Sequence, residues 1–180
     1  SIRLVGSEMC IRDRLRTNRI VPRDGLATGT SGGIIQVVQN VQGIGQVNSS
    51  GTSEYDIGLS CTITPHRSDS KILINANWPC IQNGNFTTDF YLNRGTTHIH
   101  MTQLYTSTGS WTVAYPNMMY LDSPSTTSAV TYKISAKVTS GHDLRTNYNL
   151  TNASSDDTAV HGELTGYGSR STMLLMEVSG

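Results

Sequence analysis

The sequence has little charge, few aromatic residues and no long hydrophobic run. Charged residues make up 14% of the 180 residues and aromatic residues 7%, and the formal net charge at pH 7 is zero. A dedicated nucleic-acid binder normally carries a basic stripe, and none appears after residue 23. No apolar segment approaches the roughly 20 residues that cross a bilayer. These absences argue against nucleic acid as a partner and against insertion into a membrane.

Cysteines and catalytic motifs are equally scarce. The three cysteines include no CxxC pair, which excludes a zinc site of the usual spacing. We expect Cys61 and Cys80 to be buried free thiols, with a disulfide between them as the alternative. No nucleophile elbow, P-loop or dinucleotide fingerprint occurs, so we expect no enzyme. A glycan hydrolase would need an opposed Asp/Glu pair, for which the candidates are Asp89, Asp122, Asp143, Asp156, Asp157 and Glu163.

The abundant residues are Ser, Thr, Asn and Gly, mixed with β-branched residues, which is typical of short strands joined by polar turns. Residues 55–64 alternate between apolar and polar positions, and residues 129–138 do the same. Further strands are expected at 34–41, 71–78, 86–93, 97–104, 111–115, 118–121, 146–150 and 171–178. The pattern predicts an all-β fold, a β-sandwich or jelly roll of about 8–10 antiparallel strands with an irregular N-terminal tail.

The chain divides into three parts. Residues 5–14 (VGSEMCIRDR) resemble the translation of a common sequencing adapter. We therefore expect residues 1–14 to be a disordered artefact of a metagenomic fragment whose natural start is missing; the alternative is an ordinary charged tail. Residues 15–33 are expected to form a connector, because they contain a Pro/Gly turn and a flexible Gly/Ser/Thr stretch. Residues 34–180 are expected to form the β-sandwich domain.

Several short motifs occur in a recognisable order. They are residues 19–25 (RIVPRDG), 31–38 (SGGIIQVV), 59–65 (LSCTITP), 70–74 (SKILI), 121–128 (LDSPSTTS), 130–134 (VTYKI) and 174–178 (LLMEV). The series resembles the C-terminal domain of tail-fibre or related virion-fibre proteins of marine phages, over about residues 19–180. The resemblance implies a jelly-roll sandwich that assembles as a homotrimer and attaches to an upstream fibre shaft or other virion proteins.

The same resemblance implies a function in the virion, after assembly in the host cytoplasm. The domain would lie at a fibre tip and bind a host-surface glycan or protein as its receptor. The alternatives are a head or collar decoration protein without a receptor role, a glycan-degrading tailspike domain and a bacterial surface adhesin.

His98 and His100 are the candidate metal ligands. Residues i and i+2 of a strand face the same side, so both imidazoles are expected to point together. Two imidazoles from each of three chains would surround iron or another transition metal on a trimer axis, as HxH pairs do in some phage fibres as a class. The alternative is two partly exposed histidines in a loop or edge strand.

Tyr105, Trp111, Tyr115 and Asn117 are the candidate receptor or glycan-binding residues. Sugars stack their CH faces on aromatic rings, and their hydroxyl groups need polar partners such as amides. The alternative is that Trp111 and Tyr115 pack in the core or at the trimer interface.

Overall fold

The structure, a computed structural model, describes residues 33–42, 47–49, 52–139, 143–146 and 170–179. All of these residues belong to the unit formed by Ser31–Gly180. Every regular element in the described part of the chain is a β-strand, and all strand pairs are antiparallel. The strands are β1 (Ile34–Val41), β2 (Val47–Ser49), β3 (Tyr55–Ile63), β4 (Lys71–Asn77), β5 (Cys80–Arg94), β6 (Thr97–Ala114), β7 (Asn117–Asp122), β8 (Val130–Val138), β9 (Leu144–Thr146) and β10 (Thr172–Val178).

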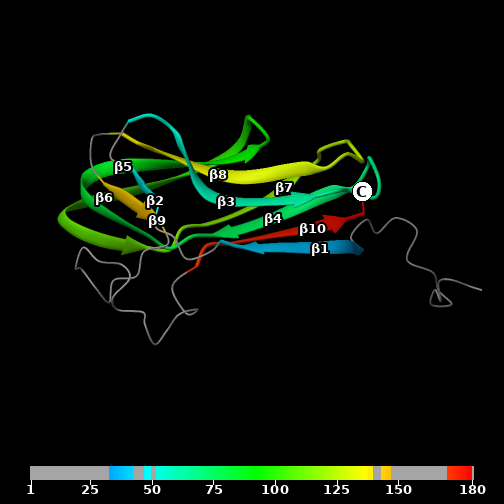
Figure 1. Ribbon diagram of the computed structural model, residues 1–180, viewed down its shortest axis with the longest axis horizontal. Coiled ribbons are helices and arrows are strands. Elements are labelled where there is room, and N and C mark those ends of the chain that lie inside the picture. Colours follow the sequence, from blue (N-terminus) through cyan, green and yellow to red (C-terminus); the bar gives the residue numbers. More distant parts are fainter. Residues whose placement is uncertain (1–32, 43–46, 50–51, 140–142, 147–169, 180) are drawn as a thin grey trace, which may run out of the picture. The chain divides into compact units, whose positions relative to one another are not determined.

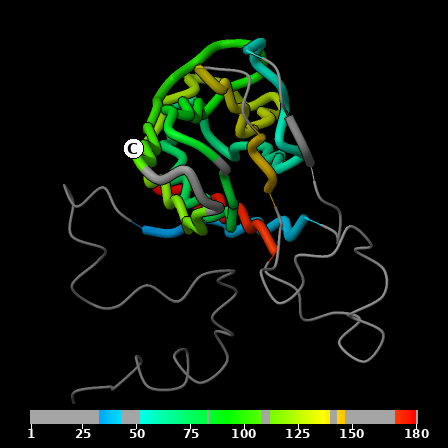
Figure 2. The backbone as a smooth tube through the Cα atoms, turned by 90° about the vertical axis from the view of Figure 1, so that its left-hand side faces the viewer, coloured from blue at the N-terminus to red at the C-terminus, as the bar shows by residue number. Residues whose placement is uncertain are grey.

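The strands form two sheets. The four-stranded sheet has the order β1-β10-β4-β7. The six-stranded sheet has the order β2-β9-β5-β8-β3, and β6 pairs with the remaining edge of β5. Figures 1 and 2 show β1 and β10 side by side along one side of the unit, away from β8. The chain crosses from one sheet to the other between β4 and β5 and returns between β6 and β7.

The hydrophobic core lies between the two sheets. Alternate residues of β4 and β10 are buried on one side, and alternate residues of β3 and β8 are buried on the other. Trp78 is fully buried, and its ring centroid lies 5.1 Å from that of Phe90 on β5. Each large apolar side chain that is fully buried stabilises the fold by roughly 1.5–3 kcal/mol. This apolar layer is therefore the main source of stability.

Strand β1 closes one side of the sandwich with side-chain amides. β3 is an edge strand of the six-stranded sheet, so its outer carbonyl groups need partners. Gln36 donates to the Thr64 carbonyl oxygen at 2.7 Å and Asn40 to the Ser60 carbonyl oxygen at 2.6 Å. Gln42, just after β1, donates to the Ile57 carbonyl oxygen at 2.9 Å. These amides, on the same side of β1 as the partly buried Val38, thus cover a sheet edge.

Glu177 on β10 is a fully buried carboxylate beside this edge. It accepts the backbone N–H of His66 at 2.8 Å and the Gln36 amide at 2.6 Å, and one oxygen lies 2.9 Å from His66 Nδ1. Burial alone would raise the pKa of Glu177, but hydrogen bonds from Ser70, His66 and Gln36 outweigh it and lower the pKa to about 2. The ionised carboxylate therefore ties β10 to β1 and to the turn between β3 and β4.

A second buried carboxylate links the sheets near β7. Asp122 accepts the Tyr132 hydroxyl of β8 at 2.7 Å and the Arg94 guanidinium of β5 at 3.0 Å. Burial, followed by the hydrogen bond and charge of Asp122, raises the pKa of Tyr132. Tyr132 therefore keeps its proton and acts as the donor.

The predicted all-β sandwich is confirmed, and so is the burial of Cys61 and Cys80 as free thiols. Two predicted strands at 97–104 and 111–115, with a turn between them, are wrong because β6 continues through both, paired with β5. The predicted loop at 43–52 contains β2, and the strand predicted at 146–150 begins earlier, as β9. Residues 147–150 lie outside the described residues. In the described part of the chain, no helix is long and apolar enough to cross a membrane.

We predict that Tyr132→Phe destabilises the domain by about 2 kcal/mol, because it removes a buried hydrogen bond to an ionised carboxylate. Urea unfolding measures the change. Tyr105→Phe is the matched control, since the exposed Tyr105 hydroxyl donates to Asn85 Oδ1 at 2.9 Å. Its expected effect is within about 0.5 kcal/mol. Equal effects of the two substitutions would contradict the structural role of the Asp122 pair.

We also predict that acid weakens the fold through Glu177. Its ordinary pKa is 4.5 and its folded pKa is about 2, so the stabilisation is complete above pH 4.5 and is lost as the pH falls toward 2. A shift of this size lowers the free energy of unfolding by about 2 kcal/mol between pH 6 and pH 3.

Urea unfolding of the wild type and Glu177→Gln at both pH values tests this. The variant should lose most of that pH dependence. Asp69→Asn should keep it, because Asp69 pairs with Arg67 on the exposed surface. A Glu177→Gln variant with the wild-type pH dependence would refute the assignment.

Candidate functional site

The outer surface of β5 and β6 carries a network of polar and aromatic side chains, which we name the polar face: Glu54, Asn85, Asp89, Tyr91, His98, Gln103 and Tyr105. The antiparallel register places Asp89 opposite Gln103, and the Gln103 amide donates to Asp89 Oδ1 at 2.8 Å. The Tyr91 hydroxyl donates to the other oxygen of Asp89 at 3.3 Å. Tyr105 is 62% exposed, and its hydroxyl contacts Asn85.

His98 extends the polar face toward Glu54. Its ring stacks on Tyr91 with 4.4 Å between centroids, and its Nε2 lies 3.0 Å from Glu54 Oε1. The Ser135 hydroxyl donates to the same Glu54 oxygen. This hydrogen bond lowers the pKa of Glu54 against the opposing effect of burial, with a smaller contribution from His98. Glu54 is therefore an ionised acceptor at neutral pH.

A β-bulge separates the two predicted metal ligands. Leu92 pairs with His100 and Asn93 pairs with His98, so Ile99 is an extra residue that interrupts the alternation. His98 therefore lies on the polar face, whereas His100 stacks on Tyr120 of the other sheet at a centroid distance of 5.1 Å. The expectation that both imidazoles point together is wrong because of this bulge.

Among the described residues, no group of three or more His, Cys, Asp or Glu side chains is placed to hold a metal ion. Binding of iron or another transition metal by His98 and His100 at a trimer axis stays a prediction.

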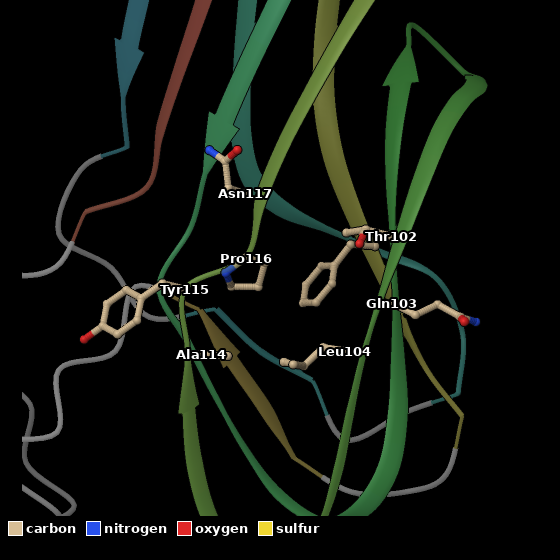
Figure 3. A pocket seen from close by; sticks show the side chains of 8 residues that line it. Thr102, Gln103, Leu104, Ala114, Tyr115, Pro116 and Asn117 are labelled. Atoms are coloured by element: carbon tan, nitrogen blue, oxygen red, sulfur yellow. The ribbon is translucent and has the colours of Figure 1, made fainter.

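A small pocket lies where β6 leads into β7. Its volume is about 210 Å³, and it is lined by Phe90 and by residues 102–104 and 114–117. Figure 3 shows Tyr115 and Gln103 pointing away from the pocket in opposite directions. The pocket is smaller than the usual 300–1,000 Å³ of a ligand site. Asn117 borders it, and the Asn117 amide donates to Asn75 Oδ1 at 2.9 Å.

The four predicted receptor residues do not form one platform. Tyr105 lies on the polar face, whereas Tyr115 and Asn117 lie at the pocket. Trp111 belongs to β6, but its side chain lies outside the described residues. Asp89 and His98 are sequence candidates only for other roles, and Glu54, Asn85, Tyr91 and Gln103 were missed, because the polar-face residues come from separate segments of the chain. The spacing of Asp89 and Tyr91 on one side of β5 is the only local signal that marks this face.

Comparison with known proteins identifies no family. No family model matches the chain, and no curated protein is similar to it. The structure of the infectious bursal disease virus Gt strain is similar over 88% of this chain and 44% of that one, with 11% identity and a TM-score of 0.41. The structure of the VP2 subviral particle of that virus is similar over 88% of this chain and 44% of its own chain, with 13% identity and a TM-score of 0.34.

Latent PorU from Porphyromonas gingivalis is also similar, over 83% of this chain and 14% of its own, with 9% identity and a TM-score of 0.34. The chain therefore spans less than half the length of each of these proteins. Similarities of this size carry no information about function.

Proposed function

We propose that this domain is a non-enzymatic module of a virion fibre that assembles as a homotrimer and binds a host-surface receptor. The motif order over residues 19–180 supports the assignment to a fibre, and with it a location in the virion and an upstream shaft or virion partner. The observation that carries receptor binding is the polar face, where aromatic rings, carboxylates and amides share one exposed surface.

The chemistry of the polar face suits a glycan. Tyr105 offers an exposed ring for a CH face of a sugar, and Asp89 and Gln103 offer an acceptor and an amide within the adjacent row of the sheet. Glu54 adds a second ionised acceptor at the other end of the network. Because these side chains stand on paired strands, their spacing is set by the sheet before a ligand arrives, which lowers the entropy cost of binding.

The carboxylates support the non-enzymatic part of the proposal. Asp122 is buried in the bonds to Tyr132 and Arg94, and Asp143 lies 3.7 Å from Arg145. Asp89 is bonded to Gln103 and Tyr91. A glycosidase needs a carboxylic acid and a carboxylate that face each other across a sugar, and these three carboxylates have structural partners instead. Asp156, Asp157 and Glu163 lie outside the described residues.

We predict that Tyr105→Ala weakens glycan binding about tenfold, the effect expected for an aromatic residue at the centre of a binding surface. The full chain is labelled and applied to an array of bacterial surface polysaccharides. Incubation of the same polysaccharides with the unlabelled chain should release no new reducing ends.

Tyr115→Ala is the matched control, because Tyr115 is 66% exposed but lies at the pocket. A tenfold loss with Tyr115→Ala and none with Tyr105→Ala would move the site from the polar face to the pocket. Failure of the wild-type chain to bind any polysaccharide or intact bacterial cell would refute host recognition.

A further inference from the structure

The outer surface of the four-stranded sheet is apolar across all four strands. The register aligns Val37 of β1 with Met176 of β10, Met176 with Leu73 of β4, and Leu73 with Leu121 of β7. This row of four apolar side chains runs from one edge of the sheet to the other. Met119 lies in the next row and is 61% exposed, and Leu121 is 48% exposed.

We name this surface the apolar face. Eight of its fourteen outward-facing positions are apolar, which exceeds the 36% hydrophobic content of the whole chain. Lys71, at one corner, carries its only charge. The fourteen residues are Val37, Gln39, Val41, Lys71, Leu73, Asn75, Asn77, Asn117, Met119, Leu121, Thr172, Leu174, Met176 and Val178.

Strand β1 shows that this distribution is not a by-product of core packing. An edge strand of a lone sandwich normally turns its apolar residues to the core and its polar residues to water. In β1, Val38 packs against the core between the inward-facing amides of Gln36 and Asn40, yet Val37 and Val41 face outward and are 55% and 41% exposed. Val37 and Val41 are not part of the core that the described residues form, and a partner surface would account for their exposure to water.

We propose that a second copy of this chain packs on the apolar face. The inference rests on the homotrimer of the proposed function and identifies the surface through which its copies meet. Four strands about 4.8 Å apart and about seven residues long present roughly 400 Å² in projection, and the accessible area is larger because side chains project from it. Stable interfaces bury about 800 Å² on each partner, so this face supplies the core of such an interface and leaves a polar rim to its neighbours.

A second copy fits this face better than a charged partner does. A single lysine gives the face no charge pattern with which to select an acidic or basic surface. Closed homo-oligomers are the commonest assemblies of soluble proteins, and in a cyclic trimer the apolar face of each copy would pack against a different surface of the next copy. Burial of the row removes apolar side chains from water without placing like charges opposite each other.

Sedimentation equilibrium of the full chain at micromolar concentration tests the proposal. The wild type should have three times the 19.5 kDa mass of one chain. Val37→Glu and Met119→Glu, on opposite edges of the face, should each reduce the mass to that of one chain at the same concentration. Far-UV circular dichroism and urea unfolding of the variants should match a folded monomer, because both side chains are largely exposed within one copy.

Met101→Glu is the matched control. Met101 is 44% exposed on β6, an edge strand of the other sheet, and pairs with Tyr91 of the polar face. This variant should keep the wild-type mass. A wild type of one-chain mass would overturn the proposal, and so would an assembly that survives both Val37→Glu and Met119→Glu.

Polysaccharide binding, measured on the same samples, separates this proposal from host recognition. An assembly that dissociates as expected but binds no polysaccharide supports the apolar face and refutes only the receptor function. A wild type that binds polysaccharide as a monomer refutes the apolar face and the homotrimer and leaves the polar face standing.

Discussion

The fold depends on one layer of apolar side chains enclosed between two antiparallel sheets. Sheets alone leave this layer open at their edges, and here charged and amide side chains close it. Asp122 joins β7 to Tyr132 and Arg94 on one side, and Glu177 joins β10 to β1 and His66 on the other. A buried carboxylate is costly unless its oxygens are bonded, and each of these has at least two donors. The polar contacts therefore fix how the sheets align, while the apolar layer supplies most of the stability.

Because alternate residues of each strand fill this layer, the remaining residues are free to set the character of the two outer faces. On the six-stranded sheet the outer side carries Glu54, Asp89, His98 and Lys133, which pair with neighbours on the same surface. The four-stranded sheet places Lys71 alone among apolar and amide side chains. Among the described residues, the outer side of the six-stranded sheet thus carries more charge than the outer side of the four-stranded sheet. This asymmetry favours a solvent-exposed outer surface on the six-stranded sheet and an outer surface buried by a partner on the four-stranded sheet.

Sequence patterns predict the strands whose alternation is strict, since residues 55–63 and 130–138 each bury every second side chain. Sequence patterns fail to predict a strand where its pairing with a neighbouring strand, rather than its own residues, keeps it extended. The Ser/Thr/Gly stretch in the middle of β6 is typical of a turn, yet it stays extended because β5 lies opposite it along its length. Asn83 pairs with Trp111 and Gly84 with Thr108, so residues 109 and 110 form a bulge in β6 opposite Gly84, whose φ is 122°. β2 has three residues and no local signal. The polar face cannot be predicted from the local sequence either, because strand pairing brings Glu54, Tyr91 and Gln103 onto one surface.

The histidine pair shows why register outweighs spacing. An HxH motif places two rings on one side only if the strand is regular through the middle residue. The bulge at Ile99 removes that regularity, so each ring finds a different aromatic partner: His98 stacks on Tyr91 and His100 on Tyr120. One ring then belongs to the polar face, and the other bridges toward the four-stranded sheet. Two residues that the sequence groups as a single metal motif thus contribute to two separate surfaces, and a metal shared by both would require the bulge to be lost.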